Sequence, residues 1–141
     1  MHKLPQIEDW LPNDRKYNTL SFRISIPSKY MNWITLSSEQ QLEEIKTNSA
    51  GKPQLIFKHS SRCAISSIAR NRLDKSILPE GIDFYFLDII SHRNISNKIA
   101  QDFRVRHESP QVLLIKGGTC VYDESHTGIH MHDIVNNAGV I

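Results

Sequence analysis

The sequence predicts an α/β fold in which a mixed sheet of about four strands carries helices on both faces. Short apolar runs that suit buried strands alternate along the chain with segments whose apolar residues recur at helical spacing. Strands that alternate with helices form parallel sheets with helices packed on them. Near the end of the chain, Gly117 and Gly118 predict a two-residue hairpin turn, which adds an antiparallel edge to the sheet.

The predicted elements follow one another from residue 39 onwards. Ser37 and Ser38 are suitable residues to begin the first helix, at about 39–46. The other helices are expected at about 63–75, 94–103 and 129–136, and the strands at 54–57, 84–90, 112–115 and 119–122. The buried apolar face expected for the second helix consists of Ile65, Ile68, Ala69 and Leu73.

The length of the chain, 141 residues, suits one domain that can bury a core without disulfides. We assign residues 31–141 to this domain. Residues 1–30 are interrupted by prolines and are interpreted as an N-terminal extension of unassigned role. Within this extension, residues 20–26 alternate between apolar and polar side chains, which is typical of a short strand.

Charge and hydropathy exclude several classes of partner. The formal net charge is +2, and Lys and Arg are scattered among acidic residues, so we expect no nucleic-acid partner. No apolar run approaches the roughly 20 residues of a membrane span, and the N-terminus lacks the apolar region of a signal peptide. We therefore expect a cytoplasmic protein, in which two cysteines do not form a structural disulfide.

Cys63 is the first candidate for chemistry, because it follows a predicted strand and begins a predicted helix. Amides at a helix N-terminus point at such a sulfur, and the helix dipole favours its anion. Arg62 adds a positive charge beside it, and Lys58 and His59 are expected to add more. As an N-cap, Cys63 can accept a hydrogen bond from the amide of Ser66. We predict that Cys63 is the nucleophile and that Arg62 and Ser66 stabilise its thiolate.

Ser66 occupies the position that holds the second cysteine of a dithiol redox motif. A serine cannot resolve a mixed disulfide, so the reaction stops there until an external thiol attacks. The alternative for this short motif is an inert cysteine that begins an ordinary helix. Cys120, in the return strand of the hairpin, needs no function as a small apolar residue; pairing with Cys63 requires Cα atoms within about 7 Å.

A second set of candidates lies around Ser109 and Pro110, directly before a predicted strand. In this topology Pro110 can lie opposite the N-terminus of the helix that Cys63 begins, and a cis Ser109–Pro110 peptide bond is plausible there. The backbone of Ser109 can then pair with an extended substrate. Arg93 opens the third helix, where an arginine can hold a carboxylate of a small thiol, and His107 precedes the proline loop. His107 is expected to orient that loop or to tune Cys63. The alternatives are a proline that only begins a strand, and His92 and Arg93 as a solvated helix start.

Three histidines, His126, His130 and His132, lie close together in the sequence. Zinc requires four ligands, and no cysteine or carboxylate set completes the site. We interpret them as surface histidines and predict no metal site.

These motifs together resemble the monothiol bacilliredoxins of the bacillithiol system, a family with a thioredoxin-like fold. The resemblance spans about residues 33–126 and rests on Phe57–Ser66, Leu87–Asp88, His92–Asn97, His107–Val112 and Ser125–His126. The family usually has Thr-Cys-Pro where this chain has Arg62-Cys63-Ala64.

The resemblance implies that Cys63 is the nucleophile and that Pro110 is a cis-proline facing it. It implies an enzyme that removes bacillithiol from S-thiolated cytoplasmic proteins. Bacillithiol, or a similar low-molecular-weight thiol, is then a co-substrate, and no cofactor is tightly bound.

Two other classes remain open at this point. Some monothiol glutaredoxins bind an iron–sulfur cluster through a comparable cysteine, but they have Gly-Phe where Ala64 and Ile65 stand, and they use glutathione. The second open class is a thioredoxin-fold binding protein in which Cys63 is inert.

Overall fold

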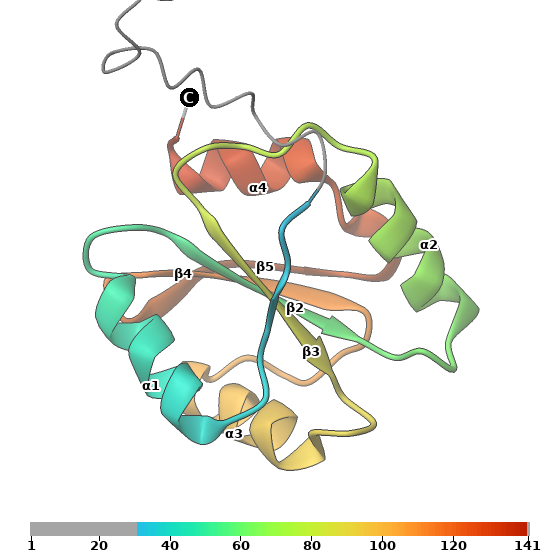
Figure 1. The fold of residues 1–141 in the computed structure, drawn as a ribbon, viewed down its shortest axis with the longest axis horizontal. Helices are drawn as coiled ribbons and strands as arrows, with labels where there is room; N and C mark the ends of the chain where they lie inside the picture. Colours follow the sequence, from blue (N-terminus) through green and yellow to red (C-terminus); the bar gives the residue numbers. More distant parts are fainter. Residues whose placement is uncertain (1–30, 141) are drawn as a thin grey trace, which may run out of the picture.

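One mixed sheet forms the centre of the molecule in the computed structural model, which describes residues 31–140 (Figure 1). Its five strands lie in the order β1-β3-β2-β4-β5. Their bounds are Ile34–Thr35 for β1, Gln54–His59 for β2, Asp83–Asp88 for β3, Gln111–Lys116 for β4 and Thr119–Ser125 for β5. Strands β1 and β2 run parallel to β3, whereas β4 is antiparallel to both β2 and β5. The predicted α/β fold with a mixed sheet is confirmed.

The strand that the sequence did not predict is β1, which makes five strands in place of about four. It consists only of Ile34 and Thr35, which pair with Tyr85 and Phe86 of β3. Two residues are too few to show a period of two. The strand expected at residues 20–26 and the N-terminal extension lie outside the described residues.

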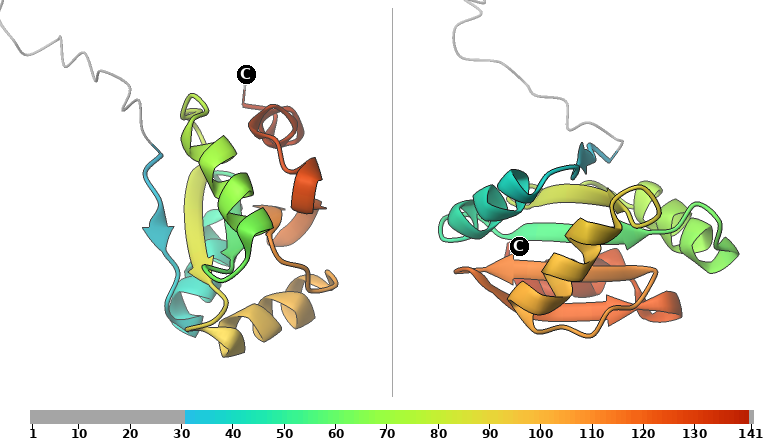
Figure 2. Two further views of the ribbon diagram at one scale, coloured as in Figure 1. Left: turned by 90° about the vertical axis from the view of Figure 1, so that its right-hand side faces the viewer. Right: turned by 90° about the horizontal axis from the view of Figure 1, so that it is seen from below.

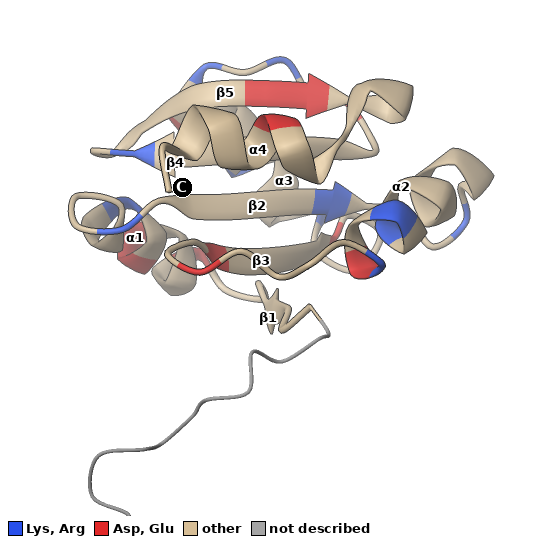
Figure 3. Cartoon of the chain, turned by 90° about the horizontal axis from the view of Figure 1, so that it is seen from above, with Lys and Arg blue, Asp and Glu red and all other residues tan. Residues whose placement is uncertain are grey.

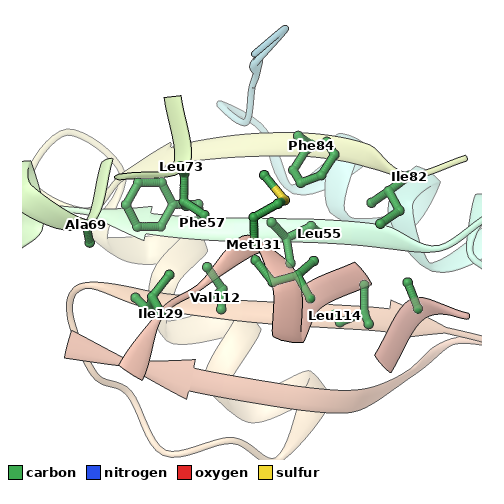
Figure 4. Packing of buried hydrophobic residues seen from close by; sticks show 12 residues of the cluster. Leu55, Phe57, Ala69, Leu73, Ile82, Phe84, Val112, Leu114, Ile129 and Met131 are labelled. Atoms are coloured by element: carbon green, nitrogen blue, oxygen red, sulfur yellow. The ribbon is translucent and has the colours of Figure 1, made fainter. Parts of the chain in front are cut away.

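Helices cover both faces of the sheet, as predicted (Figures 1 and 2). Helices α1 (Glu39–Asn48) and α3 (Arg93–Phe103) pack on one face, and α2 (Ala64–Asp74) and α4 (Met131–Ala138) pack on the other. Each face has its own apolar cluster; Figure 4 shows the cluster beneath α2 and α4. None of the helices between residues 31 and 140 has the length and apolar character that crossing a bilayer requires.

Local sequence signals account for several of the boundaries. The Ser38 side chain accepts a hydrogen bond from the Gln41 amide at 3.2 Å, and the Gln41 side chain accepts one from the Ser38 amide at 3.1 Å. This reciprocal capping box begins α1 where the sequence predicts it. Gly117 and Gly118 adopt φ angles of 58° and 77°, which two-residue hairpin turns require.

The rotation of α2 differs from the prediction. Ile65 and Ile68 are 47% and 58% exposed, so the expected apolar face is wrong at these two positions. The buried face consists of Ser66, Ala69 and Leu73. Ser66 faces the sheet because its hydroxyl bonds to the His59 ring on β2, and this contact turns Ile65 and Ile68 outward.

Strand β2 is buried along its whole length. It lies between β3 and β4, and its side chains alternate between the two apolar clusters, with Phe57 beneath α2 and α4 and Ile56 beneath α1 and α3. The prediction ended this strand at Phe57, but Lys58 and His59 continue it and pair with β3. A lysine therefore enters the core from a position that the sequence assigns to a turn.

The Lys58 ammonium lies on the α1 and α3 face and is fully buried. Its Nζ lies 3.3 Å from the Ser96 carbonyl oxygen and 3.3 Å from Nδ1 of His107. Within residues 31–140 no carboxylate forms an ion pair with it. Because burial penalises the charged form, it lowers the pKa of Lys58 from 10.5 to about 8.

Four chain segments meet at one end of the sheet, which we call the carboxyl end: residues 60–63, 89–93, 104–110 and 126–130. Strands β2 and β3 are parallel and both end there. Strand β4 begins there because it is antiparallel to β2, and β5 ends there because it is antiparallel to β4. The topology thus brings together loops that are distant in the sequence.

Replacement of Lys58 by methionine tests the cost of the buried charge. In wild type, the free energy of unfolding should rise between about pH 8 and pH 10.5, where the unfolded chain still holds the proton and the folded chain has lost it. The rise should total about 3 kcal/mol. Lys58→Met should lack this rise and should be the more stable protein at pH 7.

Denaturant unfolding at several pH values measures both effects. Lys52→Met is the matched control, because Lys52 lies before the opposite end of β2 and pairs with Asp83 in a partly exposed bridge. Equal pH profiles for wild type and Lys58→Met would contradict a buried charge at Lys58.

Candidate functional site

Cys63 is the N-cap of α2, directly after the loop that follows β2. Its backbone is extended, with φ −109° and ψ 120°, and its carbonyl accepts the first helical hydrogen bond from the Ser67 amide at 3.1 Å. The thiol is half-buried and forms neither a disulfide nor a capping hydrogen bond. The sulfur therefore lies at the positive end of the helix dipole and has no disulfide or cap hydrogen bond.

Ser66, three residues further on, is fully buried. Its hydroxyl accepts a hydrogen bond from the Ser60 amide at 3.0 Å and lies 2.6 Å from Nδ1 of His59. Either tautomer of His59 completes this hydrogen bond, so the hydroxyl is held at the imidazole. The predicted cap hydrogen bond from the Ser66 amide to the Cys63 sulfur is absent from the structure.

His59 does not add the positive charge that the sequence led us to expect. Burial, followed by the charge of Arg70, lowers the pKa of His59, so the ring is neutral at neutral pH. Lys58 faces the opposite side of the sheet, where it contacts His107. Arg62, which is exposed, is the cation adjacent to Cys63 in the chain.

The loop before β4 contains the other predicted residues. The Ser109–Pro110 peptide bond is cis. Pro110 is buried, and its carbonyl accepts a hydrogen bond from the His126 amide at 3.0 Å. The Ser109 hydroxyl is also buried, and none of the described residues bonds to it.

Gln111, the first residue of β4, holds this loop from inside the core. Its side-chain amide donates to the Arg106 carbonyl at 3.0 Å, and its side-chain oxygen accepts from the Glu108 amide at 3.4 Å. His107 lies between these two anchored residues. Burial, then the charge of Lys58, lowers the pKa of His107, and Arg93 acts in the same direction. Arg93, the exposed first residue of α3, is therefore within electrostatic reach of His107.

The structure brings the predicted residues to the carboxyl end of the sheet. Lys58 and Gln111 are direct partners across β2 and β4, so the loop that leads to Cys63 and the loop that contains Pro110 flank adjacent strands. The sequence reasoning missed the structural role of Lys58 and Gln111. The available signal was a charged residue at the end of an apolar run: if the strand continues, that residue must be buried.

Cys120 lies at the other end of the sheet. It pairs with Ile115, four residues along β4 from Gln111, which is about 14 Å at the rise of a strand. A disulfide with Cys63 would need Cα atoms within about 7 Å. Burial raises the pKa of Cys120 to about 11, which keeps it a thiol. A mixed disulfide on Cys63 therefore has no resolving thiol within the chain.

The structure shows no cluster of metal-binding side chains in the part of the chain that it describes, residues 31–140. The three neighbouring histidines His126, His130 and His132 are exposed. Basic and acidic residues are interspersed over the elements (Figure 3).

The chain is similar to several solved structures. One, described only as a candidate oxidoreductase with a thioredoxin fold, is 31% identical over 74% of this chain and 91% of its own, with a TM-score of 0.65. The thioredoxin of Malassezia sympodialis (Mala s 13) is 17% identical over 77% of this chain and 90% of its own, with a TM-score of 0.60. Thioredoxin f from spinach chloroplast is 9% identical over 79% of this chain and 95% of its own, with a TM-score of 0.57.

The last two of these show the fold alone, since their identities are low. The family match is more specific: the model of the monothiol bacilliredoxin BrxC matches residues 34–134, which include Cys63 and Pro110. The expected resemblance is thus confirmed over most of the domain. The chain therefore belongs to the monothiol bacilliredoxin BrxC family, and this membership, with the thioredoxin fold, supports a thiol redox function.

Proposed function

We propose that this protein is a cytoplasmic monothiol oxidoreductase that removes bacillithiol, or a similar small thiol, from S-thiolated proteins. The observation that carries the proposal is the uncommitted thiol of Cys63 at the N-terminus of α2, with a buried serine in the position of a resolving cysteine. Family membership supports bacillithiol as the small thiol.

The reaction consists of two exchanges. First, the Cys63 thiolate attacks the bacillithiol sulfur of the mixed disulfide. The Cys63–bacillithiol disulfide forms, the bond to the protein breaks, and the protein thiolate leaves and takes a proton from water. Second, another small-thiol anion attacks the bacillithiol sulfur on Cys63. A low-molecular-weight disulfide is released and the Cys63 thiolate is regenerated.

Each neighbour of Cys63 has a part in this scheme. The amides of the first turn of α2 and the Arg62 guanidinium stabilise the attacking thiolate. The Ser66 amide contributes to the same end, while the Ser66 hydroxyl remains bonded to His59. Because Ser66 cannot attack, the reaction waits for a second small thiol in place of closing an internal disulfide.

The substrate is held by the loops around Cys63. In this proposal Arg93 and His107 bind a carboxylate of the small thiol. The backbone of Ser109, before cis-Pro110, pairs with an extended segment of the protein substrate. Ile65 and Ile68, on the exposed side of α2 beside Cys63, supply apolar surface for that protein.

Replacement of Cys63 by serine tests the nucleophile. Cys63→Ser should remove no bacillithiol from a bacillithiolated test protein, because the attacking sulfur is absent. Cys120→Ser should retain activity close to wild type, since Cys120 is remote and stays protonated. Mass spectrometry of the test protein, before and after incubation with the enzyme and free bacillithiol, measures both.

Activity of Cys63→Ser at the wild-type level would sink this assignment and favour a binding protein with an inert cysteine. The iron–sulfur alternative would be favoured instead if wild-type protein purified without oxygen absorbed visible light and Cys63→Ser purified in the same way did not.

Replacement of Ile68 by aspartate tests the apolar protein-binding surface. Ile68→Asp should lower kcat/KM by about 10- to 150-fold for a bacillithiolated protein, because burial of an isoleucine contributes about 1.5–3 kcal/mol. It should leave the rate with the small disulfide of bacillithiol unchanged. Stopped-flow measurements with the two substrates separate the effects.

Ile77→Asp is the matched control, because Ile77 is 88% exposed and lies beyond the far end of α2. An equal loss with both substrates would show that Ile68 supports the site itself and contributes no protein-binding surface.

A further inference from the structure

The polar group that the proposed reaction leaves unexplained is the buried ammonium of Lys58. It is the penultimate residue of β2, fully buried at the carboxyl end of the sheet. A methionine there would fill the same space without the cost of burying a charge. The two contacts of Nζ, to the Ser96 carbonyl and the His107 ring, both join elements that border the site.

The contact to His107 determines where the imidazole holds its proton. An ammonium group is only a donor, so Nδ1 of His107, 3.3 Å from Lys58 Nζ, must be an acceptor. The Ser96 hydroxyl lies 3.2 Å from the same nitrogen. The neutral ring then has its proton on Nε2. Because His107 is exposed, this N–H is available as a donor at the carboxyl end of the sheet.

The backbone on each side of His107 is also held from the core. Gln111, the partner of Lys58 across β2 and β4, bonds to Arg106 on one side and to Glu108 on the other. The charged groups around the ring are Lys58, Arg93 and Glu108. The ring thus lies in a fixed loop, with Arg93 as a second donor within electrostatic reach.

We propose that Lys58 is a positioning residue for small-thiol recognition: by donating to Nδ1 of His107 from inside the core, it keeps the Nε2–H of that ring directed to a carboxylate of the small thiol. The inference rests on the proposed function. It explains why a lysine occupies a position where an apolar residue would be more stable.

The tautomer itself can be measured on the unsubstituted protein. Nitrogen-15 NMR of the imidazoles should show His107 as the Nε2–H form, with a pKa below that of an ordinary histidine. In Lys58→Met the pKa of His107 should rise, because the repelling charge is gone, and the two tautomers should mix. Lys52→Met should titrate like wild type. An Nδ1–H ring in wild type, or an unchanged titration in Lys58→Met, would overturn the inference.

Binding is measured in Cys63→Ser, which cannot form the mixed disulfide. Added bacillithiol should shift the His107 resonances, whereas 2-mercaptoethanol, which has no carboxylate, should not. The double variant that combines Cys63→Ser with Lys58→Met should bind bacillithiol about tenfold more weakly, which is the loss expected for one charge-assisted hydrogen bond. His107→Ala, at an exposed position, should weaken it equally and serves if Lys58→Met fails to fold. Unchanged bacillithiol binding in either variant overturns the inference.

The kinetic measurement compares two KM values: one for a protein that carries bacillithiol as a mixed disulfide, and one for the same protein that carries 2-mercaptoethanol instead. Lys58→Met should raise only the first KM, with kcat little changed. An equal loss with both adducts would mean general damage to the loop and would overturn the inference. Wild-type protein that removes neither adduct would refute the proposed function, while the tautomer and binding measurements would still decide the role of Lys58.

Discussion

The complete burial of β2 is the constraint on which the rest of the structure depends. Because β3 and β4 both pair with it and helices cover both faces, every side chain along it meets protein. The helix that Cys63 begins starts from its carboxyl end, and the cis-proline loop enters the sheet beside it. Cys63 and the cis-proline loop are thus both placed by the pairing of a single strand.

The local signals of the sequence predicted most of this framework. The capping box at Ser38 and the glycine pair at the hairpin depend only on neighbouring residues, so they can be recognised without the fold. The end of β2 and the rotation of α2 could not be recognised in this way. Lys58 is polar enough to suggest a turn, and only its pairing with β3 and β4 keeps it in the strand. The two exposed isoleucines of α2 fit the helical period, but the contact between Ser66 and His59 decides which side faces the sheet.

The same distinction holds for the site. Cys63 and Pro110 could be chosen as candidates from the sequence, because each lies in a short motif at the boundary of a predicted element. Lys58 and Gln111 could not, because their role depends on facing each other across β2 and β4. In both cases a polar side chain is buried where an apolar one would suffice for folding. Lys58 bonds to the ring of His107, and Gln111 bonds to the backbone of the loop that carries this ring. Buried polar groups of this kind add little to stability compared with well-packed apolar residues of similar volume.

Ser66 connects the chemistry of this protein with its surface. In a dithiol protein the residue at this position must present a sulfur to the first cysteine. Here the residue is a serine, which cannot resolve a mixed disulfide. Its hydroxyl is hydrogen-bonded to the buried His59 ring, so its side chain faces the sheet. That bond also holds α2 in the rotation that exposes Ile65 and Ile68 next to Cys63. The residue that would keep the proposed exchange monothiol therefore also orients the helix so that it exposes the apolar surface on which we expect the protein substrate to bind.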